Sequence, residues 1–183
     1  IKAFERALYL RSDFAEAYKN MGAVLKDQGN FERAAEAYKD ALKFNGRDPH
    51  GFHALAMILQ KHGKRDEAVD AYSRALSLKP DYADAHNNLG VALKELENLD
   101  GAMEAYRKAV SFRPDYAEAF DNIGRLHWLR KDFVEAFELM EWRWQKKQGS
   151  IGTKLNSDKP TWNGSDKTKV FVWKEQGIGD EIM

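Results

Sequence analysis

The sequence predicts an all-α protein: a right-handed superhelical solenoid of helical hairpins, with a short C-terminal extension that contains a strand of a truncated α/β domain. Similar peptides recur every 34 residues. Within each unit the apolar side chains follow the i, i+3, i+4, i+7 spacing of one helix face. Turn signals such as Gln28-Gly29-Asn30 divide each unit into two halves. This period is typical of arrays in which every hairpin buries its apolar face against its neighbours.

The amino-acid composition argues against several classes of function. The 183 residues include 29 Lys and Arg and 29 Asp and Glu, so the formal net charge is zero. This balance argues against binding to nucleic acid or to anionic membranes, which requires a cationic excess. No apolar run approaches the roughly 20 residues that cross a bilayer. The absence of cysteine excludes thiolate chemistry and fits a reducing compartment, so we expect a cytoplasmic protein without a cofactor.

When the units are aligned at intervals of 34 residues, equivalent positions form columns. Two of these columns define the two helices of each hairpin. A small residue in the first helix allows the second helix to approach closely, and an aromatic ring in the second helix fills the space beside it. The small column is Gly22, Ala56, Gly90 and Gly124, and the aromatic column is Phe4, Tyr38, Tyr72 and Tyr106. We therefore expect nine helices between residue 1 and about residue 148.

The columns also set the repeat boundaries. Residues 1–14 match only the second helix of a preceding, truncated unit. Four full units follow at 15–48, 49–82, 83–116 and 117–150. In the last of these, Arg143 replaces the small alanine that allows another hairpin to dock, so we expect a capping helix there. Residues 151–183 then form a linker and the beginning of a truncated Rossmann-like domain.

The columns resemble the tetratricopeptide repeat, whose pattern is an aromatic residue, Leu-Gly, Ala, a second aromatic residue, Ala and Pro. The resemblance covers roughly four fifths of the chain. Four positions depart from it: Gly46 replaces the proline, Glu97 and Lys131 replace the glycine of the turn within a hairpin, and Arg143 replaces an alanine. The family implies a non-catalytic scaffold that binds an extended peptide or a partner segment on its concave face.

The outward positions of the first helices are the candidate binding groove. Asn20, Asn88 and Asn122 share one column, and their amides can hydrogen-bond the main chain of a peptide without selecting its side chains. This column resembles the asparagine ladder of O-linked N-acetylglucosamine transferases. The alternative is that these residues only solvate the groove. The full candidate set is Lys19, Asn20, Lys26, His53, Asn87, Asn88, Lys94, Asp121, Asn122 and Arg125.

Two other binding modes are disfavoured. Chaperone-binding tetratricopeptide domains clamp a peptide carboxylate with Lys and Asn. Lys19 fits that pattern, but Ala23 and Ala54 replace the two asparagines. His50 and His53 share a helix face, yet a metal site needs at least one further well-placed ligand, so we predict no metal.

The tail carries a second, weaker signal. Residues 168–173 have the β-branched and aromatic content of a strand. A loop with Gly177, Gly179 and Asp180 follows, as at the opening of a βα unit, where main-chain N–H groups can hold a phosphate. With Trp142-Arg143-Trp144 and Pro160-Thr161-Trp162-Asn163-Gly164, this segment resembles bacterial proteins that fuse tetratricopeptide repeats to a nucleotide-sugar glycosyltransferase-like domain.

That resemblance implies an alternative function: the acceptor-recognition part of a glycosyltransferase. It also implies that the catalytic residues and the donor-binding half lie outside this sequence, so the chain itself is expected to be inactive. A single strand cannot satisfy its own main-chain groups. We therefore expect the tail to pack near Trp128, Trp142 and Trp144 and its strand to pair with a second copy in a homodimer. The alternative is a tail held only by lattice contacts.

Overall fold

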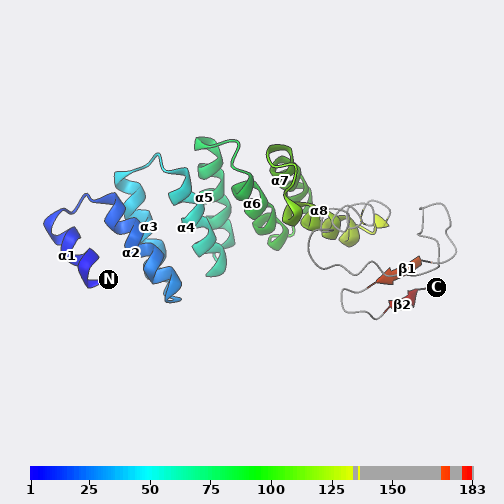
Figure 1. Ribbon diagram of the computed structural model, residues 1–183, viewed down its shortest axis with the longest axis horizontal. Coiled ribbons are helices and arrows are strands. Elements are labelled where there is room, and N and C mark those ends of the chain that lie inside the picture. Colours follow the sequence, from blue (N-terminus) through cyan, green and yellow to red (C-terminus); the bar gives the residue numbers. More distant parts are fainter. Residues whose placement is uncertain (134–135, 137–169, 174–178, 183) are drawn as a thin grey trace.

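The computed structural model describes residues 1–133, residue 136 and the short segments 170–173 and 179–182. Eight helices stand side by side along the long axis of the molecule (Figure 1). They are α1 (Lys2–Leu10), α2 (Ala15–Asp27), α3 (Phe31–Phe44), α4 (Pro49–Lys61), α5 (Arg65–Leu78), α6 (Ala83–Glu95), α7 (Leu99–Phe112) and α8 (Ala117–Leu129).

The helix positions confirm the register of the repeat. The first helices of the hairpins begin at Ala15, Pro49, Ala83 and Ala117, at the 34-residue interval of the sequence columns. Within residues 1–133 there is no strand. The expected ninth helix lies outside the described residues apart from Phe133 and Ala136, which are both helical.

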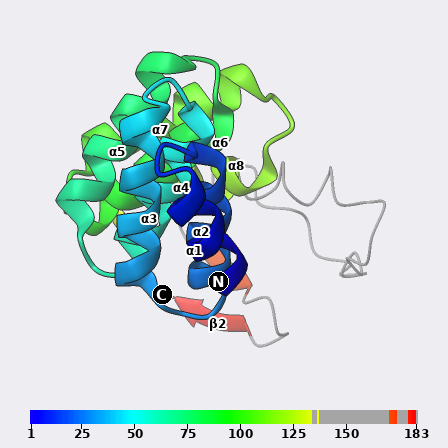
Figure 2. The same ribbon diagram turned by 90° about the vertical axis from the view of Figure 1, so that its left-hand side faces the viewer.

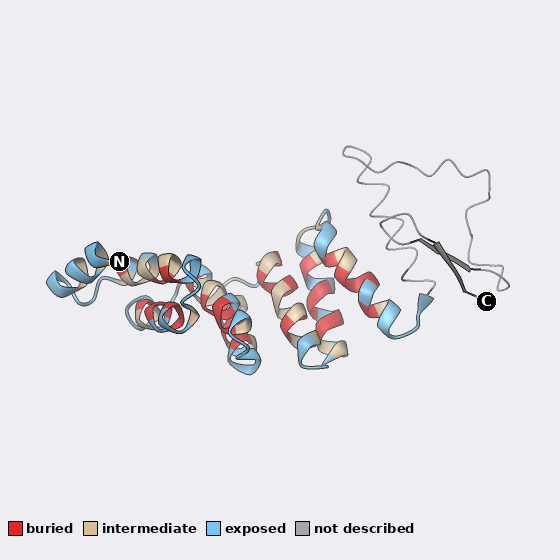
Figure 3. Ribbon diagram, turned by 90° about the horizontal axis from the view of Figure 1, so that it is seen from below, coloured by how far each residue is buried: buried red, intermediate tan, exposed pale blue. Residues whose placement is uncertain are grey.

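The hairpins form two layers around a narrow core. Figure 2 looks along the row of helices, with α3 and α5 on the left and α6 and α8 on the right. The even-numbered helices are the first helices of the hairpins and form one layer, and α3, α5 and α7 form the other. Buried residues (red in Figure 3) lie on the helix faces where the layers meet, and they are mostly alanines with one tyrosine each from α3, α5 and α7.

The close approach between layers depends on the small column. A Cβ atom at Gly22 would lie 2.6 Å from the Tyr38 ring, and one at Gly90 would lie 2.5 Å from the Tyr106 ring. Tyr106 has no exposed surface, so its ring cannot move freely away. The structure therefore confirms that a small residue and an aromatic ring share each of these two crossings.

The turn within each hairpin keeps one backbone conformation whatever residue occupies it. Gly29 and Gly63 have φ angles of 76° and 81°, and Glu97 and Lys131 have 61° and 64° at the equivalent positions. This left-handed region costs a residue with a Cβ about 1 kcal/mol relative to glycine. The two departures from the repeat pattern are therefore accommodated as local strain rather than as a different turn.

The tail differs from the predicted βα unit. Strand β1 (Val170–Trp173) is followed by β2 (Gly179–Ile182), and the two pair antiparallel with Val170 opposite Ile182 and Trp173 opposite Gly179. The prediction that Gly179 and Asp180 belong to a loop that opens a βα unit is therefore wrong, because both residues lie in β2. The main-chain groups of β1 pair with β2 of the same chain. We had expected these groups to pair with a second copy of the chain. Gly177, Trp142 and Trp144 lie outside the described residues, so the packing predicted for the tail does too.

Candidate functional site

Hydrogen bonds between successive first helices show which side chains share a face. Asn88 on α6 donates from Nδ2 to His53 Nε2 on α4 over 3.0 Å. Asn122 on α8 donates from Nδ2 to Asn87 Oδ1 on α6, also over 3.0 Å. The predicted groove positions of α4, α6 and α8 therefore lie together on one face of the layer of even-numbered helices.

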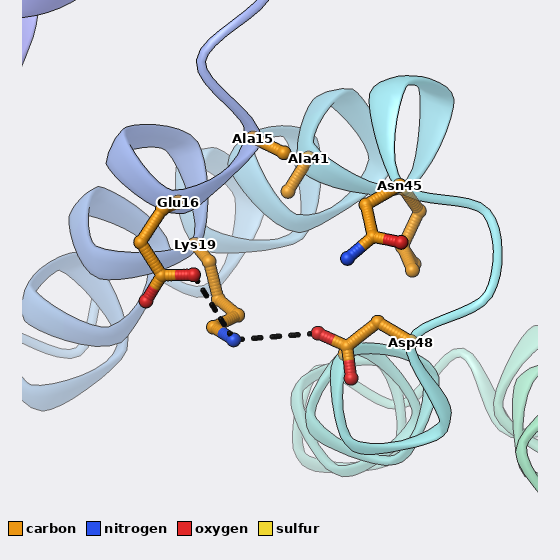
Figure 4. A pocket seen from close by; sticks show the side chains of 8 residues that line it. Ala15, Glu16, Lys19, Ala41, Asn45 and Asp48 are labelled. Atoms are coloured by element: carbon orange, nitrogen blue, oxygen red, sulfur yellow. Dashed lines mark hydrogen bonds and ion pairs between the residues drawn. The ribbon is translucent and has the colours of Figure 1, made fainter.

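Lys19 lies at the α2 end of this face and already has partners (Figure 4). Its Nζ is 3.4 Å from Glu16 Oε2 and 3.4 Å from Asp48 Oδ2. Burial lowers the pKa of Lys19, but the two carboxylates outweigh burial and raise it. Asp48 also accepts from the backbone N–H of His50 at the start of α4, over 3.0 Å. The charge of Lys19 is thus compensated within the chain, and the cavity of about 10 Å³ beside it holds no more than one water.

A chain of hydrogen bonds joins α4 to α6. The OH of Tyr82 lies 3.1 Å from His50 Nδ1 and 3.3 Å from His53 Nδ1. Because the amide nitrogen of Asn88 can only donate, His53 Nε2 accepts and the ring proton resides on Nδ1. His53 Nδ1–H then donates to Tyr82, whose OH donates to His50. Burial lowers the pKa of His53, which keeps this arrangement neutral and satisfied near pH 7.

Asn122 and Asn87 do not have the exposed positions that we predicted. Asn87 is fully buried, and Asn122 is 9% exposed. Asn87 accepts from Asn122 and donates from its own Nδ2 to Glu118 Oε1 over 3.1 Å. The prediction that Asn122 lies exposed is therefore wrong, because its amide bonds to the buried Asn87 on the neighbouring helix α6. This pair connects α6 to α8.

The remaining predicted groove residues differ in their exposure and in their ion pairs. Asn20 is exposed on α2, and no contact joins it to Asn88, because α4 carries Ala54 at the intervening position. Lys26 lies 3.5 Å from Asp27, and Arg125 pairs with Asp121 over 2.8 Å. Lys94 is half-buried on α6. The asparagine column is therefore not a continuous row of equivalent groups.

A hollow between α4 and α6 was not predicted. It has a volume of about 280 Å³ and is lined by Met57, Gln60, Lys61, Tyr72, Asn88 and Glu95. Met57 is 45% exposed although it is a large apolar residue. The sequence held a signal for it, because the equivalent positions of the other first helices are Ala23, Val91 and Arg125, and Met57 is the largest apolar member of that column.

Polar groups around the hollow hold one another in place. The OH of Tyr72 donates to Gln60 Oε1 over 3.0 Å, and Gln60 Nε2 donates to Glu95 Oε1 over 3.2 Å. Arg65 Nε donates to the other carboxylate oxygen of Glu95 over 3.2 Å. The rim is thus ordered by internal bonds, and the charge of Glu95 is balanced by Arg65.

The histidines do not converge on a metal site. His86 bonds from Nε2 to the Pro80 carbonyl oxygen over 2.9 Å, while His50 and His53 share Tyr82. Within the described part of the chain, no three His, Cys, Asp or Glu side chains are grouped to hold a metal ion. Among the same residues, no helix is long and apolar enough to span a membrane.

Comparison with known proteins identifies the repeats. Family models described as tetratricopeptide repeat match residues 15–48 and 53–117. The chain therefore belongs to the proteins that carry tetratricopeptide repeats. No curated protein sequence matches it.

Solved structures show the same solenoid fold. A crystal structure of MamA superposes with a TM-score of 0.78 at 24% identity, over 81% of this chain and 86% of that one. YrrB, described as a tetratricopeptide-repeat protein with an unusual peptide-binding site, superposes with a TM-score of 0.70 at 24% identity, over 80% and 75% of the two chains. The first repeat domain of Spaghetti (RPAP3), bound to the HSP90 peptide SRMEEVD, gives 0.62 at 20% identity, over 64% and 93%.

Proposed function

We propose that this chain is a protein-interaction module that binds an extended peptide along the face formed by α2, α4, α6 and α8. The observation that carries the proposal is the state of Asn88. Its Nδ2 is held by His53, but its Oδ1 accepts no hydrogen bond within the described residues and is not enclosed. A fixed, accessible carbonyl oxygen is suited to accept from a peptide main-chain N–H.

The neighbouring groups support the same use. Asn20 is exposed at the equivalent position of α2, and the hollow beside Asn88 offers an apolar surface in Met57. YrrB and the RPAP3 domain, which share the fold, are described with a peptide-binding site and a bound peptide. The peptide main chain is expected to follow Asn20 and Asn88, whereas Asn87 and Asn122 connect helices.

The test is binding of a peptide selected from a random library by the wild-type protein. Asn88→Ala is expected to weaken that peptide by about 1 kcal/mol, the usual net contribution of one hydrogen bond. Ser73→Ala, which removes an exposed hydroxyl on α5 in the other layer of helices, is the control and is expected to leave the affinity unchanged. Equal affinity for wild type and Asn88→Ala would contradict the proposal.

The alternative function is acceptor recognition for a glycosyltransferase domain. Its support is the sequence between Trp142 and Asp180, and the antiparallel pairing of β1 with β2 adds nothing to it. The gene sequence beyond Met183 tests it: several hundred residues with a βα pattern favour the enzyme, and a stop codon favours the scaffold.

A homodimer through the tail is a further proposal, supported by the unpaired edges that a two-stranded ribbon retains. Light scattering on the chain with and without residues 150–183 tests it, since a dimer that survives the deletion cannot depend on the tail. The zero net charge supports a protein that binds neither nucleic acid nor anionic membranes, and a filter-binding assay with duplex DNA checks the first of these. The lack of cysteine fits the proposed cytoplasmic location.

A further inference from the structure

We infer that the hollow between α4 and α6 is the specificity pocket of the groove, and that it takes one medium-sized apolar side chain of an extended peptide whose next residues are acidic. This inference rests on the proposed peptide-binding function and names the chemistry of the ligand. It draws on three observations: an exposed methionine in the hollow, rim groups that bond to one another, and an exposed lysine without an ion pair at its edge.

The hollow presents one exposed apolar side chain, and this side chain is adaptable. Met57 lines the hollow and is 45% exposed, and Tyr72, which also lines it, is fully buried. Methionine has three rotatable bonds and a polarisable sulfur, so it adapts its shape to an incoming side chain. The volume of about 280 Å³ greatly exceeds the roughly 30 Å³ share of one water. It therefore has room for a leucine or methionine side chain.

The rim fixes what the pocket accepts. The bonds that join Tyr72, Gln60, Glu95 and Arg65 occupy the polar groups of these four side chains around Met57. A polar ligand side chain would lose water there without a compensating partner, whereas an apolar one would gain by burial. Asn88, which also lines the hollow, places its free carbonyl oxygen where the peptide main chain enters.

The charge at the edge of the hollow is positive. Glu95 is balanced by Arg65, but Lys61 is exposed and its Nζ lies over the Phe31 ring at 5.1 Å without an ion pair. Acidic residues that follow the apolar side chain would therefore find complementary charge.

The experiment uses methionine methyl groups as reporters. The chain has five methionines, of which Met57 lines the hollow and Met103 is buried at 4% exposure in a second core cluster. Protein labelled with ¹³C at the methionine methyls is titrated with blocked peptides of Gly and Ser that carry a central Leu followed by two Glu. Matched peptides carry a central Ala, or two Lys in place of the two Glu.

We expect the Leu-Glu-Glu peptide to shift the Met57 methyl signal while that of Met103 stays in place. Its affinity is expected to exceed that of the Ala peptide about tenfold, from burial of the leucine, and that of the Lys peptide several-fold. Met57→Ala and Lys61→Glu are expected to remove these preferences. Leu78→Ala and Lys2→Glu make the same changes at exposed residues outside the hollow and serve as controls.

Each other outcome overturns the inference. Peptides that bind with signals shifted elsewhere, or with equal affinity for Leu and Ala, would place the ligand outside the hollow and leave the proposed function intact. A Met57 signal that moves with protein concentration alone would make a second copy the occupant. Absence of binding by all peptides, including the library-selected one, would overturn both the pocket and the proposed function.

Discussion

Replacing Asn122 with alanine separates a structural asparagine from a peptide-binding one. In the folded chain Asn122 Nδ2 donates to Asn87 Oδ1 over 3.0 Å, and Asn87 has no exposed surface. The substitution leaves a buried carbonyl oxygen without a partner, and such a group costs about 1–3 kcal/mol. We expect the free energy of unfolding to fall by that amount.

Urea unfolding followed by circular dichroism measures this loss. Asn20→Ala is the matched control, because Asn20 occupies the same repeat column but is exposed, and surface substitutions usually change stability by less than about 0.5 kcal/mol. Asn122→Asp is expected to be at least as damaging, since it sets a carboxylate against the Asn87 oxygen. A stability of Asn122→Ala within about 0.5 kcal/mol of wild type would refute the role assigned to this bond.

Three further predictions concern the turn, the helix crossings and the histidines. Glu97→Gly is expected to stabilise the chain by about 1 kcal/mol by relieving the left-handed turn, and an unchanged urea midpoint would contradict that strain. Ala68→Leu and Ala102→Leu, at positions without exposed surface, are expected to lower stability by about 1–3 kcal/mol; melting temperatures equal to the parent's would argue against close crossings. Because burial lowers the pKa of His53 and His86 below 6.5, the unfolded chain binds protons first on acidification. Stability is expected to fall as the pH drops below about 6.5, and less so in His53→Gln, as pH-dependent denaturation would show.

The repeat architecture could be predicted because the period is encoded many times. Four copies agree on the small and aromatic columns. A residue that departs from the pattern at one position, such as Glu97 or Lys131, therefore does not shift the register. The helix starts at Ala15, Pro49, Ala83 and Ala117 follow directly from that agreement.

The exposure of individual groove residues could not be predicted in the same way. A column fixes which way a side chain points, but its burial depends on neighbours contributed by other repeats. Asn122 is enclosed because the preceding first helix carries Asn87, which is in turn held by Glu118. Asn20 has no such neighbours and is exposed.

The second strand of the tail could not be predicted for a related reason. A strand followed by a glycine-containing loop is compatible with a βα unit and with a hairpin. The choice depends on whether the second segment finds a strand to pair with. Here Gly179–Ile182 pairs with Val170–Trp173, an interaction that no local pattern in the sequence specifies.

Mapping the backbone amide signals of the protein during titration with a library-selected peptide tests the central claim most directly. We predict that the largest shifts fall on α4 and α6 around Met57 and Asn88, with smaller shifts near Asn20 on α2. Shifts concentrated on α3, α5 and α7, with the even-numbered helices unaffected, would place the ligand on the opposite layer and contradict the claim that the first helices form the binding face.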